Sequence, residues 1–162
     1  MTTQEESLIT DEMRAAIGRE GSPVRYEVDK LGVRQFARAV GHTDPVFFDE
    51  QHARDLGHRS ILAPPGYLGS PVYRADAPQR SPGDPDPSSG GRRWRALNGG
   101  SEYQYTGVDI CAGDVLTAAS KVVDIRQTKG SLGPMIITRR ESVYTNQDGV
   151  VVCRAVGTAI QY

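Results

Sequence analysis

The sequence predicts an α+β fold whose strands form one curved antiparallel sheet, and three observations lead to this prediction. Helical patterns dominate the first half of the chain, within residues 10–73. Strand patterns rich in Val, Ile, Thr and Tyr begin at residue 103 and continue to the end. The two patterns do not alternate as they do in doubly wound folds. The length of 162 residues, with 38% hydrophobic and 24% charged side chains, suits a single domain over residues 1–162.

The first predicted element is a short amphipathic helix over residues 10–19. Met13, Ala16 and Ile17 recur at the i, i+3, i+4 spacing of one helical face, and glycines follow at once. Residues 24–28 then alternate between apolar and charged side chains, which is the period of a half-buried strand. The chain therefore opens with a helix followed by a strand.

A longer amphipathic helix is predicted after that strand. Asp29 can cap its N-terminus, and Gly41 suits the left-handed position that ends it. Its apolar stripe comprises Val33, Phe36, Ala37 and Val40. We expect this stripe to face the core.

Two more helices are expected before the strands begin. Residues 50–56 form a short helix between an Asp49 cap and Gly57, with Ala53 and Leu56 facing inward. Proline suits a first helical turn, so a further helix is predicted over about residues 65–73, packed against the sheet.

The second half of the chain predicts a surface loop and then strands. Residues 77–91 carry almost no apolar side chain and are dense in Pro, Gly, Asp and Ser, which predicts a long flexible loop. Strands are predicted around 103–105 and over 115–126, 135–144 and 150–160. Asn146-Gln147-Asp148-Gly149 is typical of a hairpin turn between the last two. The exposed edge of such a sheet predicts a dimer, formed with a second copy or with a paralogue.

Composition narrows the class of partner and the compartment. Nineteen basic and twenty acidic side chains give a net charge of −1, so no overall field points to nucleic acid or an anionic membrane. No apolar run approaches the ~20 residues that span a bilayer, and the N-terminus is polar and acidic, so we expect a cytoplasmic protein without a membrane span. Cys111 and Cys153 form no CxxC pattern, and buried free thiols are expected.

Three segments carry the residues that point to chemistry. They are GHTDPVFFD at 41–49, LAPPGY at 62–67, and LNGGSEY at 97–103 followed by AGDVL at 112–116. In their order and spacing they resemble the MaoC-like (R)-specific enoyl-CoA hydratases and dehydratases, most closely the N-terminal-type, FAS1-like dehydratase branch. The resemblance covers nearly the whole chain. It implies a hot-dog fold, in which a curved antiparallel sheet wraps a central helix.

The first of these segments departs from the family pattern where the family has its catalytic residues. That pattern reads Gly-Asp-x-Asn-Pro-x-His, with a catalytic Asp and His. Gly41 and Pro45 match it, whereas His42 stands at the Asp, Asp44 at the Asn and Phe47 at the His. The resemblance therefore implies a hydratase frame without its proton-transfer pair.

Addition of water to an enoyl thioester requires a base, an acid and donors for the developing enolate oxygen. Phe47 cannot transfer a proton. His42 and Asp44 remain candidates for catalysis, with a structural alternative for each. Asp44 before a proline favours a turn, and a histidine beyond a helix C-terminus interacts favourably with the helix dipole.

Four residues are candidates for substrate binding. By the resemblance, the Gly66 N–H at the start of the central helix binds the thioester carbonyl, although glycine can equally serve turn geometry alone. Phe47 and Tyr67, with the 77–91 loop, are expected to shape the acyl pocket. Trp94, within the basic segment 92–95, can stack on the adenine of coenzyme A, or it can simply anchor the loop.

The resulting hypothesis is a non-catalytic subunit of a heteromeric (R)-specific enoyl-CoA hydratase or dehydratase acting on a bulky or long acyl thioester. A paralogous hot-dog subunit would carry the Asp and His. Two alternatives stay open: a self-sufficient homodimeric hydratase using His42 and Asp44, and an acyl-thioester-binding protein without catalysis. We expect no cofactor beyond the coenzyme A or acyl-carrier thioester, and no metal, because His42, His52 and His58 lack a recognised metal spacing.

Overall fold

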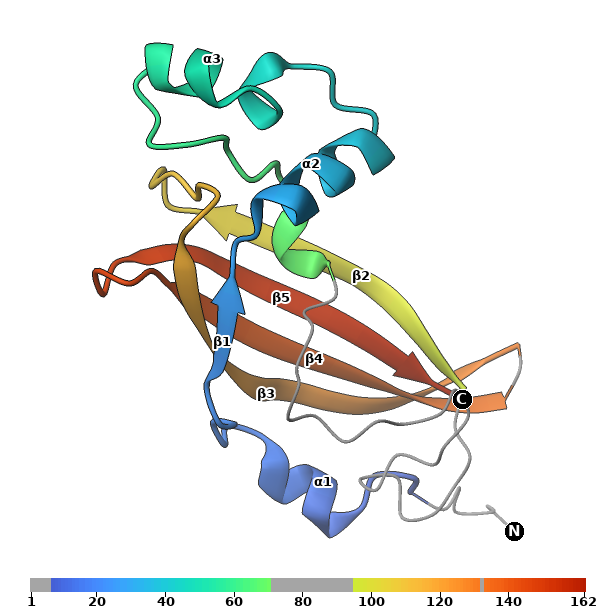
Figure 1. Ribbon diagram of the computed structural model, residues 1–162. Helices are drawn as coiled ribbons and strands as arrows, with labels where there is room; N and C mark the ends of the chain where they lie inside the picture. Colours follow the sequence, from blue (N-terminus) through green and yellow to red (C-terminus); the bar gives the residue numbers. More distant parts are fainter. Residues whose placement is uncertain (1–6, 71–94, 132) are drawn as a thin grey trace, which may run out of the picture.

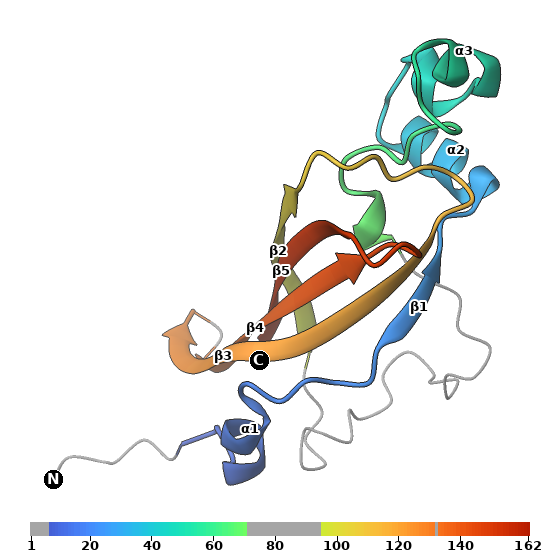
Figure 2. The same ribbon diagram turned by 90° about the vertical axis from the view of Figure 1, so that its left-hand side faces the viewer.

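The computed structural model describes residues 7–70, 95–131 and 133–162, and it contains the predicted antiparallel sheet. Five strands lie in the order β1-β3-β4-β5-β2 (Figure 1). They are β1 (Val24–Glu27), β2 (Ala96–Tyr105), β3 (Val115–Gly130), β4 (Gly133–Thr145) and β5 (Val151–Gln161). The sheet curves along its length (Figure 2). The α+β prediction is confirmed.

The helices lie on the segments that the sequence indicated. They are α1 (Asp11–Ala16), α2 (Lys30–Ala39) and α3 (Glu50–Asp55), with two 3-10 turns, η1 (Pro45–Phe47) and η2 (Tyr67–Gly69). Thr10, Asp29 and Asp49 cap the three α-helices, and each accepts a hydrogen bond from a backbone N–H of the first turn. No helix in the described part of the chain is long and apolar enough to cross a membrane.

The helix predicted over residues 65–73 requires correction. Pro65 and Gly66 precede the helical segment instead of starting it, and Gly66 is left-handed with φ 88°. The described part contains only the 3-10 turn η2, and residues 71–73 lie outside the described residues, as does the predicted 77–91 loop. The left-handed glycine explains the late start, because a helix cannot continue through that conformation.

Three residues assigned to apolar helix faces are exposed for one shared reason. Ile17, Val40 and Leu56 are 43%, 54% and 58% exposed. Each is the residue that follows the last helical position of α1, α2 or α3. The 3.6-residue period stops where the helix stops, so apolar spacing no longer fixes which way these side chains face. The rest of the α2 stripe packs as predicted, with Val33 and Ala37 buried and Phe36 against the core.

The core lies on the inner face of the sheet, which we define as the face that carries Tyr26, Leu116 and Tyr144. It is covered by side chains of α2, α3 and η2 (Figure 2). Both cysteines are buried and free, as predicted, and burial raises the pKa of each thiol.

A buried carboxylate fixes the connection between β2 and β3 beside the core. Asp114 accepts two hydrogen bonds from Arg59, at 2.7 and 2.9 Å, and one from the Cys111 N–H at 2.8 Å. Burial alone would raise the Asp114 pKa, but the bonds from Arg59, Cys111 and Gln147 hold it below its ordinary value. The loop that carries Cys111 is thereby held against the segment that leads to Gly66, where Ala63 donates to the Ile110 carbonyl.

Candidate functional site

The 41–49 loop has a defined geometry that its own residues enforce. Gly41 takes φ 81° beyond the end of α2. The Gly41 N–H bonds the Arg38 carbonyl and the His42 N–H bonds the Ala37 carbonyl, which together form a Schellman end to the helix. The Asp44 carboxylate then accepts the Val46 N–H at 3.0 Å and caps η1. The predicted turn at Asp44-Pro45 is therefore present.

His42 lies against an aromatic ring. Its ring centroid is 4.8 Å from that of Phe47, with the ring planes tilted by 43°. Asp44 directs its carboxylate to the backbone of Val46, and no hydrogen bond joins Asp44 to His42 in the described structure. A general base of the His type is normally oriented by such a carboxylate. His42 and Asp44 are near neighbours in the sequence, but the loop does not arrange them as a hydrogen-bonded pair.

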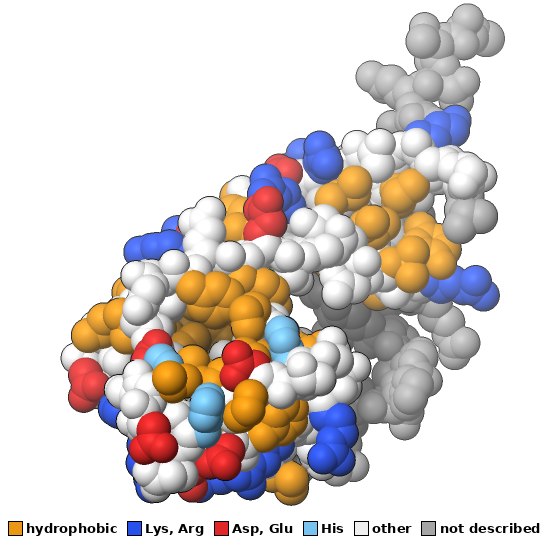
Figure 3. Space-filling view, turned by 90° about the horizontal axis from the view of Figure 1, so that it is seen from above, with side chains coloured by type: hydrophobic (Ala, Val, Ile, Leu, Met, Phe, Trp, Pro, Cys, Tyr) orange, Lys and Arg blue, Asp and Glu red, His pale blue; other side chains and the backbone are white. Residues whose placement is uncertain are grey.

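Phe47 forms part of an apolar wall. It is half-buried and packs against the hydrophobic core, as do Phe36 of α2 and Leu62. Viewed from above, this end of the molecule shows a hollow lined by hydrophobic side chains, with histidine and acidic side chains around it (Figure 3). Phe47 thus offers an apolar surface beside His42.

Gly66 and Tyr67, the two candidates from the second motif, lie beside that wall. The Gly66 N–H donates to the Tyr105 hydroxyl at 2.9 Å. A Cβ at Gly66 would stand 3.5 Å from Cζ of Phe36, an ordinary contact distance, so the left-handed φ and not crowding favours glycine here. Tyr67 is buried, and its ring packs edge-on against Phe36 and Tyr26 at centroid distances of 5.8 and 6.4 Å.

Tyrosine hydroxyls supply the polar groups of this region. Burial raises the pKa of Tyr26, Tyr67 and Tyr105, and it raises the pKa of Tyr144 to about 12. The Tyr26 hydroxyl donates to the Ser70 carbonyl at 3.0 Å. At neutral pH all four phenols stay protonated, so they can donate hydrogen bonds but cannot act as bases.

Tyr105 is the site residue that sequence reasoning missed. Its oxygen accepts the Gly66 N–H, which leaves its own hydroxyl proton available for an acceptor. The side chain is 41% exposed. The sequence placed Tyr105 on a strand, but its contact with Gly66 spans 39 positions and has no local pattern. A carbonyl arriving beside Gly66 would therefore meet the Tyr105 hydroxyl, because the Gly66 N–H is already bonded to the Tyr105 oxygen.

The contact between His58 and Asp109 was also not predicted from the sequence. His58 Nδ1 lies 2.6 Å from an Asp109 carboxylate oxygen, although the two residues are 51 positions apart. This contact ties the end of α3 to the loop before β3. Within the described ranges no group of three or more His, Cys, Asp or Glu side chains is placed to hold a metal ion. Trp94, the candidate for stacking on adenine, lies outside the described residues.

The sequence has relatives that cover most of its length. A family model described as "FAS1-like, dehydratase domain region" matches residues 15–155. A UPF0336 protein of Streptomyces griseus is 34% identical over 116 residues, which are 71% of this chain and 74% of the relative.

Solved structures show the same fold. A chain of the HadBC (3R-hydroxyacyl-ACP dehydratase) complex of Mycobacterium tuberculosis gives a TM-score of 0.67 at 22% identity, covering 94% of this chain and 99% of that one. A chain of the ChsH1-ChsH2 complex of the same organism gives 0.69 at 18% identity, covering 93% and 92%. At these identities the similarity establishes the hot-dog fold.

Proposed function

The chain belongs to the family of FAS1-like dehydratase domain regions, and from this premise we propose that it is the non-catalytic, acyl-pocket-forming subunit of a heteromeric (R)-specific enoyl-CoA hydratase or dehydratase. One observation carries the proposal: Phe47 stands at the family's catalytic histidine position and packs against His42 and the core. By the resemblance, the loop keeps its Gly41 and Pro45, while Phe47 replaces the catalytic histidine and His42 replaces the catalytic aspartate.

The other groups near Gly66 support this division of roles. Protonated tyrosines can hold a carbonyl oxygen but cannot activate water at neutral pH. The Gly66 N–H donates to the Tyr105 oxygen, so the Tyr105 hydroxyl proton is the donor left at one end of the wall. We infer that the thioester carbonyl lies at this end and that the acyl chain lies along Phe36, Phe47 and Tyr67. The base and the acid must then come from another chain.

The open edge of β2 supports a partner of the same fold. At its two ends β2 bonds β5 through Arg95 with Tyr162 and through Thr106 with Val152. Backbone groups alternate sides along a strand. The register pairs Glu102 with Val156 and Gln104 with Arg154, and the backbone groups of these residues point toward β5. Ser101, one position before Glu102, therefore directs its N–H and C=O away from β5. The strand is exposed along this edge, and a paralogous hot-dog chain is its natural occupant. Both solved relatives described above come from complexes.

The implied substrate is a thioester of coenzyme A or of an acyl carrier protein. An apolar wall in place of a catalytic histidine favours a bulky or long acyl group. The pocket requires no further cofactor for hydration, because the reaction needs only water, an acid, a base and oxyanion donors.

The proposal makes a specific prediction for the complex assembled with a catalytic paralogue. His42→Ala should leave kcat within about threefold, since loss of a true general acid or base costs about 10²–10⁴-fold. Phe47→Ala should instead raise KM for a long-chain enoyl-CoA by about tenfold, because it removes contact area worth 1–3 kcal/mol. Steady-state hydration of a short and a long enoyl-CoA measures both effects.

Phe47→Leu is the matched control, because it keeps an apolar side chain and should retain most of the affinity for the long substrate. A fall of kcat by a hundredfold or more in His42→Ala would assign the proton transfer to this chain. It would then favour the self-sufficient hydratase.

A further inference from the structure

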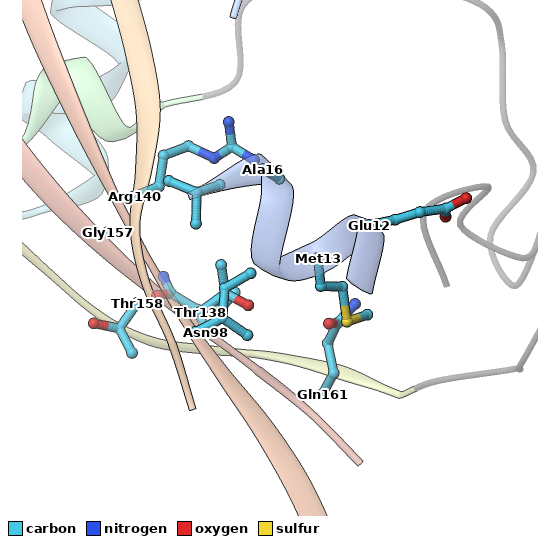
Figure 4. Close-up of a pocket in the computed structure, with 12 residues that line it drawn as sticks. Glu12, Met13, Ala16, Asn98, Thr138, Arg140, Gly157, Thr158 and Gln161 are labelled. Atoms are coloured by element: carbon cyan, nitrogen blue, oxygen red, sulfur yellow. The ribbon is translucent and has the colours of Figure 1, made fainter. Parts of the chain in front are cut away.

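A cavity lies between α1 and the inner face of the sheet, away from η2 (Figure 1). It has a volume of about 460 Å³. Side chains of α1 form one wall, and strands β2 to β5 form the other (Figure 4). A cavity of this size falls within the range of small-molecule sites.

The strand register shows how this cavity relates to the core. Arg140 pairs with Gly157 and Val122, in the same way that Tyr144 pairs with Cys153 further along the same two strands. Residues separated by an even number of positions share a face. Arg140 therefore lies on the inner face, four residues from Tyr144 along β4, or roughly 13 Å at the rise of a strand.

The cavity combines an apolar wall with one cation. Met13, Ala16 and Ile125 supply apolar surface, and Thr138 and Gln161 supply hydrogen-bonding groups. Glu12 also borders the cavity, but its carboxylate points away from the strands (Figure 4).

Arg140 is the only arginine among the lining residues, and nothing in the described ranges forms a salt bridge or hydrogen bond with its guanidinium. A guanidinium presents its donors in a fork that matches a carboxylate. Arg140 is exposed and its guanidinium lies beside Ala16 (Figure 4), at one end of the apolar wall. A ligand with a carboxylate and an alkyl chain matches this arrangement.

Gly157 supplies an independent indication that space is kept open here. It lies in the interior of β5, where glycine weakens a strand and often marks the close approach of a ligand. A Cβ built on Gly157 would meet no atom within 4 Å, and its φ is not in the left-handed region. Neither backbone conformation nor crowding therefore requires a glycine at this position.

We propose that this cavity binds an alkyl carboxylate, with the carboxylate on Arg140 and the chain along Met13, Ala16 and Ile125. The same chemistry is offered by a free fatty acid and by the far end of an acyl thioester that carries a terminal carboxylate. The inference stands on the cavity itself and does not require the proposed hydratase role.

Calorimetric titration of the purified full chain with dodecanoate tests the proposal. Binding is expected, and Arg140→Ala should weaken it by tenfold or more. Arg139→Ala is the matched control, because Arg139 lies on the opposite face of β4 and does not line the cavity. This substitution removes the same charge and should leave the affinity for dodecanoate unchanged. Gly157→Leu should abolish binding by filling the space, without strain in a strand.

The proposal is overturned if dodecanoate does not bind, or if Arg140→Ala and Gly157→Leu bind it as tightly as the unaltered chain. The two sources are separated by titration with the coenzyme A thioesters of dodecanoic acid and of dodecanedioic acid. If the chain prefers the dodecanedioic thioester and Arg140→Ala removes that preference, the site binds the terminal carboxylate of an acyl group. Equal binding of both thioesters, unaffected by Arg140→Ala, assigns it to the free acid.

Discussion

Replacing Tyr67 with alanine should lower the free energy of unfolding by about 3–5 kcal/mol, the usual cost of deleting a large buried aromatic side chain. Tyr67 is 5% exposed and joins three parts of the fold. Its ring contacts Phe36 of α2 and Tyr26 of β1, and it lies on the segment that leads from Gly66. Chemical denaturation at fixed protein concentration measures the change.

Tyr67→Phe separates the contribution of the ring from that of the hydroxyl. It keeps both edge-on contacts and removes only the hydroxyl, so the loss should stay within about 0.5–1.5 kcal/mol. A loss equal to that of Tyr67→Ala would show that the ring packing is not what joins the wall to the core.

Replacing Ser101 with proline should raise the dissociation constant for a partner chain by about tenfold to a hundredfold. Proline has no N–H, so one backbone carbonyl of the partner strand would lose its hydrogen bond, at a cost of about 1–3 kcal/mol. The Ser101 N–H points away from β5, so the fold of the chain itself should be nearly unaffected. Analytical ultracentrifugation over a concentration series measures the dissociation constant.

Glu102→Pro is the paired control one residue further along. Its N–H points toward Val156 of β5, so this proline should lower the stability of the chain itself. If Ser101→Pro assembles as tightly as the unaltered chain, then β2 is not the edge at which the partner binds.

Local features of the fold could be predicted because their causes are local. The helix caps at Asp29 and Asp49, the left-handed Gly41 and the turn at 146–149 each depend on a few neighbouring residues. The three C-terminal cap residues of α1 to α3 were assigned to apolar faces wrongly, because periodicity indicates a face only while the helix continues. The early helix start at Pro65 failed for a similar reason, since the left-handed Gly66 delays it.

The candidate site could be predicted only in part. Phe47 and Gly66 were identified through the motif, whereas Tyr105 meets Gly66 across the sheet and has no sequence signal. The same holds for His58 with Asp109 and for the cavity around Arg140, which joins α1 to strands β2 to β5, far later in the sequence. Contacts between distant segments depend on register and curvature, which periodicity does not specify.

In the proposed assembly, this chain completes an active site whose proton-transfer groups belong to another chain. The most direct test is to titrate this chain into a fixed amount of the paralogue that carries the intact motif while measuring enoyl-CoA hydration. We expect negligible turnover by this chain alone, a rate that rises until the two chains are equimolar, and a plateau beyond that point. Full activity from this chain alone, or a paralogue rate that its addition leaves unchanged, would rule out a shared active site.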